Sequence, residues 1–262
     1  MSVPTLADVA IAAWRWLEYA GLLGFIGVVV VRRLAGMPAA LGWARVSMQP
    51  ALAAAFTGGV GVLIGESLQS GHLVSEVIVR VAAEGIALAL CVYVHRWVVP
   101  PAMFAVLALP FASHAVVDPS GGAIFIDAFH ILSAGAWAGG ILALATLRPP
   151  DGWRGEEGRI LLARFGPVAF LAFTATALSG ALRAAEVLGS ASYLFSTPYG
   201  LVLAAKAAGV LVMVAMSAIG WSRGWRFTRW EGVVVLFVLA ATALLAAFPM
   251  PPVYSIVELL GR

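Results

Sequence analysis

Charged residues are scarce in this chain of 262 residues: they make up 11% of it, where soluble domains carry about 25%. Hydrophobic residues make up 62%, and the mean hydropathy is +0.98. This balance excludes an ordinary soluble domain and predicts an integral membrane protein. The net charge of +3 does not indicate a nucleic-acid partner, because the arginines fall in short links rather than on one face.

The chain has a single cysteine, Cys91, which excludes an internal disulfide framework and a cluster of thiolate ligands. It lacks the Gly-rich loop of nucleotide-binding proteins, so direct use of ATP is not expected. Residues 1–8 contain neither Lys nor Arg. The basic start of a cleavable signal peptide is therefore missing, and we expect the first apolar run to remain as a helix.

Eight apolar runs long enough to cross a bilayer follow one another along the chain. A spanning helix needs roughly 20 mostly apolar residues, and none of the runs shows the period-two alternation of membrane β-strands. We therefore predict an all-α, polytopic membrane protein with a single domain of eight transmembrane helices. Their approximate ranges are 8–31, 48–67, 75–94, 98–117, 123–147, 162–188, 199–220 and 231–248.

Lys and Arg occur in every second link between these runs. The links after the first, third, fifth and seventh runs contain arginines, whereas the links 68–74, 116–122 and 189–198 contain neither residue. Cytoplasmic loops are enriched in Lys and Arg. This pattern predicts that both termini lie outside, on the periplasmic side of a bacterial inner membrane.

Two histidines flank the short turn between the fourth and fifth runs. His114 precedes the turn and His130 follows it, so we expect both at similar depth near the outer surface. Imidazole within a membrane usually has a function, and neutral imidazole binds copper, zinc and iron. The pair predicts a metal site, with Asp118 and Asp127 fixing the two rings. The structural alternative is two helix-end histidines that bond backbone carbonyls or water.

The other ionisable residues of the apolar runs gather in their outer halves, which predicts a polar vestibule open to the outside. Glu76, Arg80 and Glu84 recur at every fourth position and share one helix face, as structural ion pairs or as part of this vestibule. Glu84, Glu186 and Lys206, the only lysine, are our candidates for tuning its charge.

Four sulfur-containing residues form a second candidate feature. Met213 and Met216 are three residues apart in the inner half of the seventh run, and Met103 and Cys91 lie at comparable depth. Soft sulfur ligands favour Cu(I), so these residues predict a soft-ligand path below a histidine entry site. Ordinary core or lipid-facing methionines are the alternative.

Trp137 lies seven residues after His130, two turns further along the same helix face. The nearby Gly135, Gly139 and Gly140 allow close approach of another helix, as small residues do in membrane proteins. We expect these glycines to pack against the preceding run, 98–117, or the following one, 162–188.

The chain resembles the copper resistance protein D (CopD/PcoD) family in several short motifs that occur in the family's order. Ser113 and Gly166 depart from the glycine and the serine of the family pattern. The motifs are Ser113-His114-Ala115, the stretch from His130 through Trp137 to Gly140, Arg164-Phe165-Gly166, Leu178-Ser179-Gly180, and Thr197-Pro198-Tyr199-Gly200 followed by Lys206.

This resemblance implies an eight-helix inner-membrane protein for copper uptake or copper resistance, without an enzyme activity. It implies a separate periplasmic copper-binding protein of the CopC type as a partner. His114 and His130 are the copper ligands that we predict. Two other functions remain open. The same histidines could bind haem in a membrane redox protein or oxidase, with Trp137 lining the macrocycle, or the protein could dock a CopC-like partner without passing metal.

Overall fold

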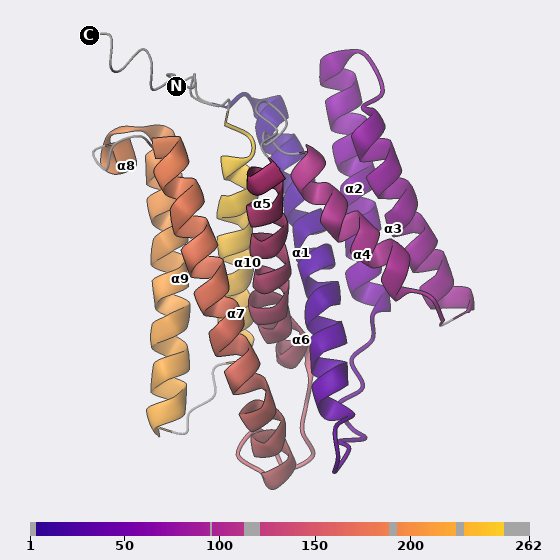
Figure 1. Ribbon diagram of the computed structural model, residues 1–262, viewed down its shortest axis with the longest axis vertical. Helices are drawn as coiled ribbons and strands as arrows, with labels where there is room; N and C mark the ends of the chain where they lie inside the picture. The colour runs from indigo at the N-terminus through magenta and orange to yellow at the C-terminus, as the bar shows by residue number, and fades with distance from the viewer. Residues whose placement is uncertain (1–3, 95, 113–120, 189–192, 224–227, 249–262) are drawn as a thin grey trace.

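The computed structural model describes residues 4–94, 96–112, 121–188, 193–223 and 228–248 (Figure 1). The secondary structure of these residues is helical, without a strand, which confirms the all-α prediction. The helices are α1 (Leu6–Ala35), α2 (Gln49–Ser70), α3 (Ser75–Tyr93), α4 (Val99–Ala108), η1 (Leu109–Ala112), α5 (Gly121–Ala134), η3 (Gly135–Gly139), α6 (Gly140–Thr146), α7 (Glu156–Leu188), α8 (Tyr193–Ser196), α9 (Pro198–Arg223) and α10 (Thr228–Leu245).

Each of the eight predicted ranges overlaps helix in the described residues, and residues 113–117 of the fourth range lie outside them. Within the described residues, four helical segments are long and apolar enough to cross a membrane, which supports a multi-pass membrane protein. These four are Gln49–Ser70, Ile124–Thr146, Glu156–Ala184 and Pro198–Ile219, and a shorter apolar helix spans Val99–Phe111. The count of eight spans stays a prediction.

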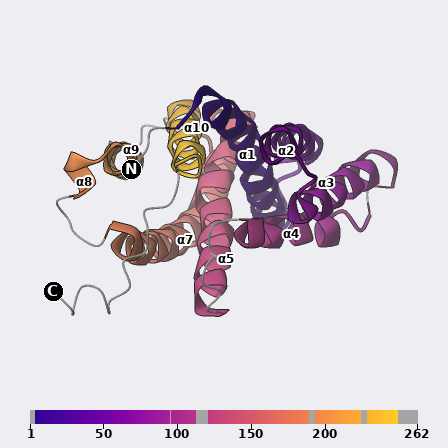
Figure 2. The ribbon, with the colours of Figure 1, turned by 90° about the horizontal axis from the view of Figure 1, so that it is seen from above.

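Helix α1 lies in the middle of the bundle. Seen from above, α2, α3 and α4 lie on one side of α1 and α5, and α7, α9 and α10 lie on the other (Figure 2). The start of α1 and the end of α10 lie at the same end of the bundle (Figure 1). There, Nη1 of Arg15 donates a 2.9 Å hydrogen bond to the carbonyl of Ala246. This arrangement agrees with an even number of crossings, while the side of the membrane stays a prediction.

A very close contact between helices joins α1 to the π-helical segment η3. A Cβ added to Gly139 would overlap the carbonyl of Leu23, and a Cβ added to Gly27 would overlap the backbone of Gly139. The prediction for the glycines was therefore only partly right. Gly139 packs against α1, whereas Gly140 faces the ring of Phe165 in α7, the following run. Only glycine permits this approach, as at other close crossings of membrane helices.

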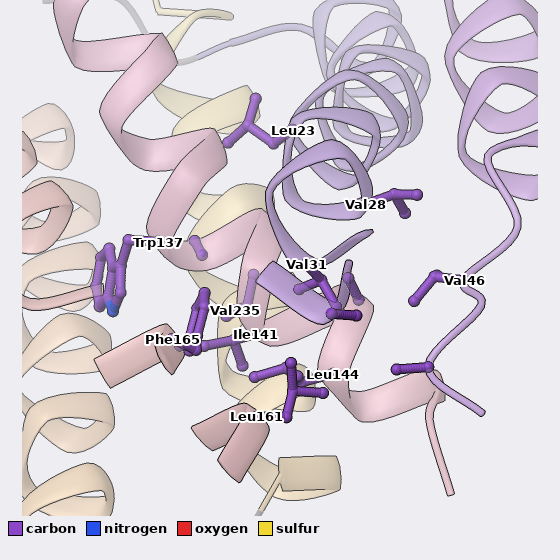
Figure 3. Close-up of a cluster of buried hydrophobic side chains, with 14 of the residues drawn as sticks. Leu23, Val28, Val31, Val46, Trp137, Ile141, Leu144, Leu161, Phe165 and Val235 are labelled. Atoms are coloured by element: carbon purple, nitrogen blue, oxygen red, sulfur yellow. The ribbon is translucent and has the colours of Figure 1, made fainter. Parts of the chain in front are cut away.

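A hydrophobic cluster at the other end of the bundle holds α1, α6, α7 and α10 together (Figure 3). Val31 and Leu161 are fully buried there, and Val235 is 1% exposed. Beside this cluster, Arg164 of α7 bonds the last turn of α1 and the link that follows it. Its Nη1 donates to the carbonyl of Leu34 at 3.0 Å, and its Nη2 to the carbonyl of Pro38 at 2.6 Å. The guanidinium therefore fixes the α1–α2 link against α7.

Candidate functional site

Polar side chains of α5 and α7 pair across the interface between these two antiparallel helices. On each helix these polar residues are three or four positions apart, so they lie on one face of that helix. We call this set the polar ladder. It consists of Asp127, His130 and Ser133 on α5 and of Arg183, Ser179 and Thr176 on α7. Such polar contacts between apolar helices join them within a membrane.

His130 occupies the middle of the polar ladder. Its Nδ1 lies 2.9 Å from the hydroxyl oxygen of Ser179. The Ser179 hydroxyl donates its single proton to the carbonyl of Ala175, at 2.7 Å. When that proton is on the Ala175 carbonyl, Ser179 accepts a hydrogen bond from Nδ1–H of the neutral ring. This assignment leaves the lone pair on Nε2, which is the form in which imidazole binds a metal ion.

Space for the imidazole comes from the residue after Ser179. A Cβ on Gly180 would lie 3.2 Å from Cε1 of His130, which is tighter than an ordinary van der Waals contact. Gly180 therefore lets the ring lie flat against α7 while Ser179 holds one of its nitrogens. The two residues position His130 together, and both belong to the motif at residues 178–180 noted in the sequence.

Asp127 forms the outermost pair of the polar ladder. Its carboxylate receives two hydrogen bonds from Arg183, one from Nε at 2.7 Å and one from Nη2 at 3.0 Å. Both side chains are partly buried, at 17% and 27% exposure. We expected Asp127 to fix the ring of His130. In the structure that contact is made by Ser179, and Asp127 pairs with Arg183.

The ladder ends, on the side that leads into α6, with two aromatic rings. The hydroxyl of Thr176 lies 2.9 Å from that of Ser133. One turn further, Trp137 and Phe173 pack edge to face, with ring centroids 4.8 Å apart. Trp137 is 7% exposed and belongs to the hydrophobic cluster of Figure 3. The polar contacts therefore stop at this aromatic pair, and apolar packing continues beyond it.

Two cations act on the ladder's histidine. The charges of Lys206 on α9 and Arg183 on α7 both influence the ring of His130 electrostatically. Lys206 is half-buried. The role of Lys206 in tuning the charge of an outer vestibule stays a prediction.

The other predicted ligands lie outside the described residues or stand apart from one another. His114 and Asp118 lie outside the described residues, as does the side chain of Glu186. Within the described part of the chain, no group of three or more His, Cys, Asp or Glu residues could hold a metal ion. The pairing of His114 with His130 therefore stays a prediction.

The four sulfur-containing residues do not form one path. Met213 is 1% exposed and packs in the cluster of α1, α6, α7 and α10. Cys91 and Met103 pack against a different cluster, built from α1, α2, α3 and α4. Met216 on α9 is partly exposed. Because α1 and α5 separate the two groups (Figure 2), the predicted soft-ligand path is not assembled.

Glu84 does not line an open vestibule, because its side chain is fully buried between α1, α2 and α3. Arg80, which we expected to pair along its own helix, instead binds Glu18 of α1, with Nε 2.6 Å from Oε1. Glu76 is exposed. The spacing of residues along one helix predicts only contacts within that helix, so the contact between Arg80 and Glu18 was not predicted. An acidic residue within the first apolar run was the signal that such a partner exists.

One comparison with known proteins finds a relative. The chain is 31% identical over 170 residues to the copper transport protein CutJ of Bacillus subtilis (strain 168). The match covers 60% of this chain and 31% of CutJ, so the chain matches about a third of that protein's length. No protein-family profile matches the chain, and no solved structure matches it.

Proposed function

We propose that this protein binds copper at the polar ladder and carries it across a bacterial inner membrane. The similarity to CutJ, a protein named for copper transport, is the observation that carries this proposal. The apolar helices of the chain support a place in the bilayer. The geometry of His130 supports the choice of site, because a ring that Ser179 holds through Nδ1 has Nε2 as the nitrogen that can bind a metal ion.

In this proposal, copper enters from the outer side and binds Nε2 of His130. Ser179 holds the ring through Nδ1, which fixes both its tautomer and its direction. His114, adjacent in the expected hairpin, supplies a second imidazole. Trp137 and Phe173 close the inner end of the polar contacts, so onward movement of the ion requires these rings to move. A periplasmic donor of the CopC type would deliver the ion.

The experiment is metal analysis with an optical spectrum on the full chain purified in detergent. Wild type is compared with His130→Ala and with His72→Ala as the matched control. His72 is an exposed histidine, and its Nδ1 lies 3.1 Å from the carbonyl oxygen of its neighbour Ser70. We expect wild type and His72→Ala to retain copper after dialysis and His130→Ala to lose it. Equal copper in all three proteins would refute the site. A haem absorption band lost only in His130→Ala would assign the site to haem instead.

A second variant tests the role of Ser179. Removing the partner that orients a metal-binding histidine typically weakens metal binding by about 10- to 100-fold. We expect Ser179→Ala to weaken copper binding by about this factor, as measured by competition with a copper chelator. Thr174→Ala is the control, because Thr174 is an exposed residue of the same helix whose hydroxyl donates to the carbonyl of Phe170, within its own helix. Equal affinities of the two variants would contradict the assigned tautomer.

A further inference from the structure

A buried group of three charged residues lies on the other side of α1 from the polar ladder. Glu18 of α1 and Glu84 of α3 are fully buried, and Arg80 of α3 is 3% exposed. Arg80 donates two hydrogen bonds to Glu18, from Nε at 2.6 Å and from Nη2 at 3.3 Å. Both oxygens of Glu18 are therefore occupied by the guanidinium.

Two glycines of α2 make the space for these carboxyl groups. A Cβ on Gly59 would collide with Oε2 of Glu84, and a Cβ on Gly58 would collide with the backbone of Glu18. At these two positions α2 therefore has no side chain that would displace the carboxyl groups. The two carboxyl groups can therefore interact electrostatically across this buried space.

The carboxyl group of Glu84 lacks a donor. Among the described residues, no N–H or O–H group reaches either of its oxygens. The carboxyl group of Glu18 is its neighbour in the same buried space, because Gly58 contacts Glu18 and the adjacent Gly59 contacts Glu84. Two ionised carboxylates cannot bond each other, because both only accept. A hydrogen bond between them requires a proton on one of the two.

Charge leads to the same conclusion. With both carboxyl groups ionised, the group carries one unpaired negative charge in a fully buried place, where such a charge is strongly unfavourable. With one proton, the group is neutral. The neighbouring ionisable residues are Arg15 and Tyr19 of α1 and Glu66 of α2. Arg15 is already paired with Glu66, and α4 contributes no ionisable side chain within its bounds.

We propose that Glu18, Arg80 and Glu84 form a proton-binding site. Glu84 carries the proton, and its O–H group donates a hydrogen bond to the carboxylate of Glu18. Arg80 holds that carboxylate in place. Release of the proton to water breaks the O–H bond of Glu84 and changes the net charge of the group from zero to minus one. The ligand is a proton rather than a metal cation, because the guanidinium already occupies the oxygens of Glu18 and repels another cation. The site does not depend on copper binding at the polar ladder.

Infrared spectroscopy of the purified full chain tests the proposal directly. A protonated carboxyl group shows a C=O stretching band that a carboxylate lacks. We expect wild type at neutral pH to show this band with a shift in D₂O, Glu84→Gln to lose it, and Glu76→Gln to retain it. Glu76 is the matched control, because it is exposed and lies eight residues earlier on the same helix. A wild-type spectrum without the band would overturn the proposal.

Thermal unfolding at different pH values gives a second readout. The folded chain would hold a proton that unfolded Glu84 releases at neutral pH, so the stability of wild type should fall as the pH rises. Glutamine resembles the protonated acid and can donate to Glu18. We therefore expect Glu84→Gln to fold and to show a flatter pH dependence, whereas Glu76→Gln should follow wild type. Parallel curves for wild type and Glu84→Gln, or failure of Glu84→Gln alone to fold, would contradict the shared proton.

Discussion

The contact between Gly139 and α1 makes a sharp prediction about stability. In Gly139→Ala, the new methyl group would overlap the carbonyl of Leu23 and crowd the amide of Gly27. Both are backbone atoms of a long helix, so neither can turn away as a side chain would. Overpacking of this kind costs about 1 to 3 kcal/mol, occasionally more. Gly140→Ala should cost less, because it meets the ring of Phe165, which can rotate.

The assay is the thermal unfolding midpoint of the purified protein, followed by tryptophan fluorescence. In chains of this size, each kcal/mol of lost unfolding free energy lowers the midpoint by about 2 to 4 °C. We therefore expect Gly139→Ala to unfold roughly 2 to 12 °C below wild type. Gly166→Ala is the control, because a Cβ there meets no atom within 4 Å. Its midpoint should equal or exceed that of wild type. Equal midpoints for Gly139→Ala and Gly166→Ala would refute the close approach of η3 and α1.

Two further predictions concern arginines. In a double-mutant cycle of Asp127→Asn and Arg183→Gln, we expect a coupling energy of about 0.5 to 1 kcal/mol, because the pair is partly exposed to solvent. A coupling energy near zero would contradict the pairing. Arg164→Lys keeps the charge but cannot bond several carbonyls with a planar fork, so trypsin should cleave the link 36–48 at Arg45 faster than in wild type. Unchanged cleavage would show that Arg164 does not hold this link.

The helical ranges could be predicted from the sequence because a bilayer constrains apolar length so strongly. The predicted range 123–147 corresponds to α5, η3 and α6 together, and only its internal π-helical turn was missed. Nothing in the letters Gly-Ala-Trp-Ala-Gly requires such a turn. The turn lies where Gly139 approaches Gly27, on a helix more than a hundred residues earlier in the chain, and the sequence does not show this contact.

The site could be predicted only in part. His130 was found because imidazole is rare and costly in an apolar run. Its partner Ser179 was not, since a serine in an apolar helix has many possible roles, and the matching spacing on α7 became meaningful only once the two helices were paired. The pairing of Arg80 with Glu18 was missed for the same reason. They are 62 residues apart, and helix periodicity carries no information about contacts over that separation.

The π-helical turn of η3 has a consequence for how one continuous helix can serve two neighbours. Each residue of an α-helix advances the side-chain direction by about 100°, and a turn closed from i to i+5 holds an additional residue. Side chains beyond Gly139 are therefore out of phase with those before Gly135. The outer portion, α5, directs its polar face to α7, while α6 contacts α1 and α10. The π-helical turn therefore changes the side-chain direction between α5 and α6. Deleting a single residue within it would rotate the polar ladder relative to the apolar packing of α6.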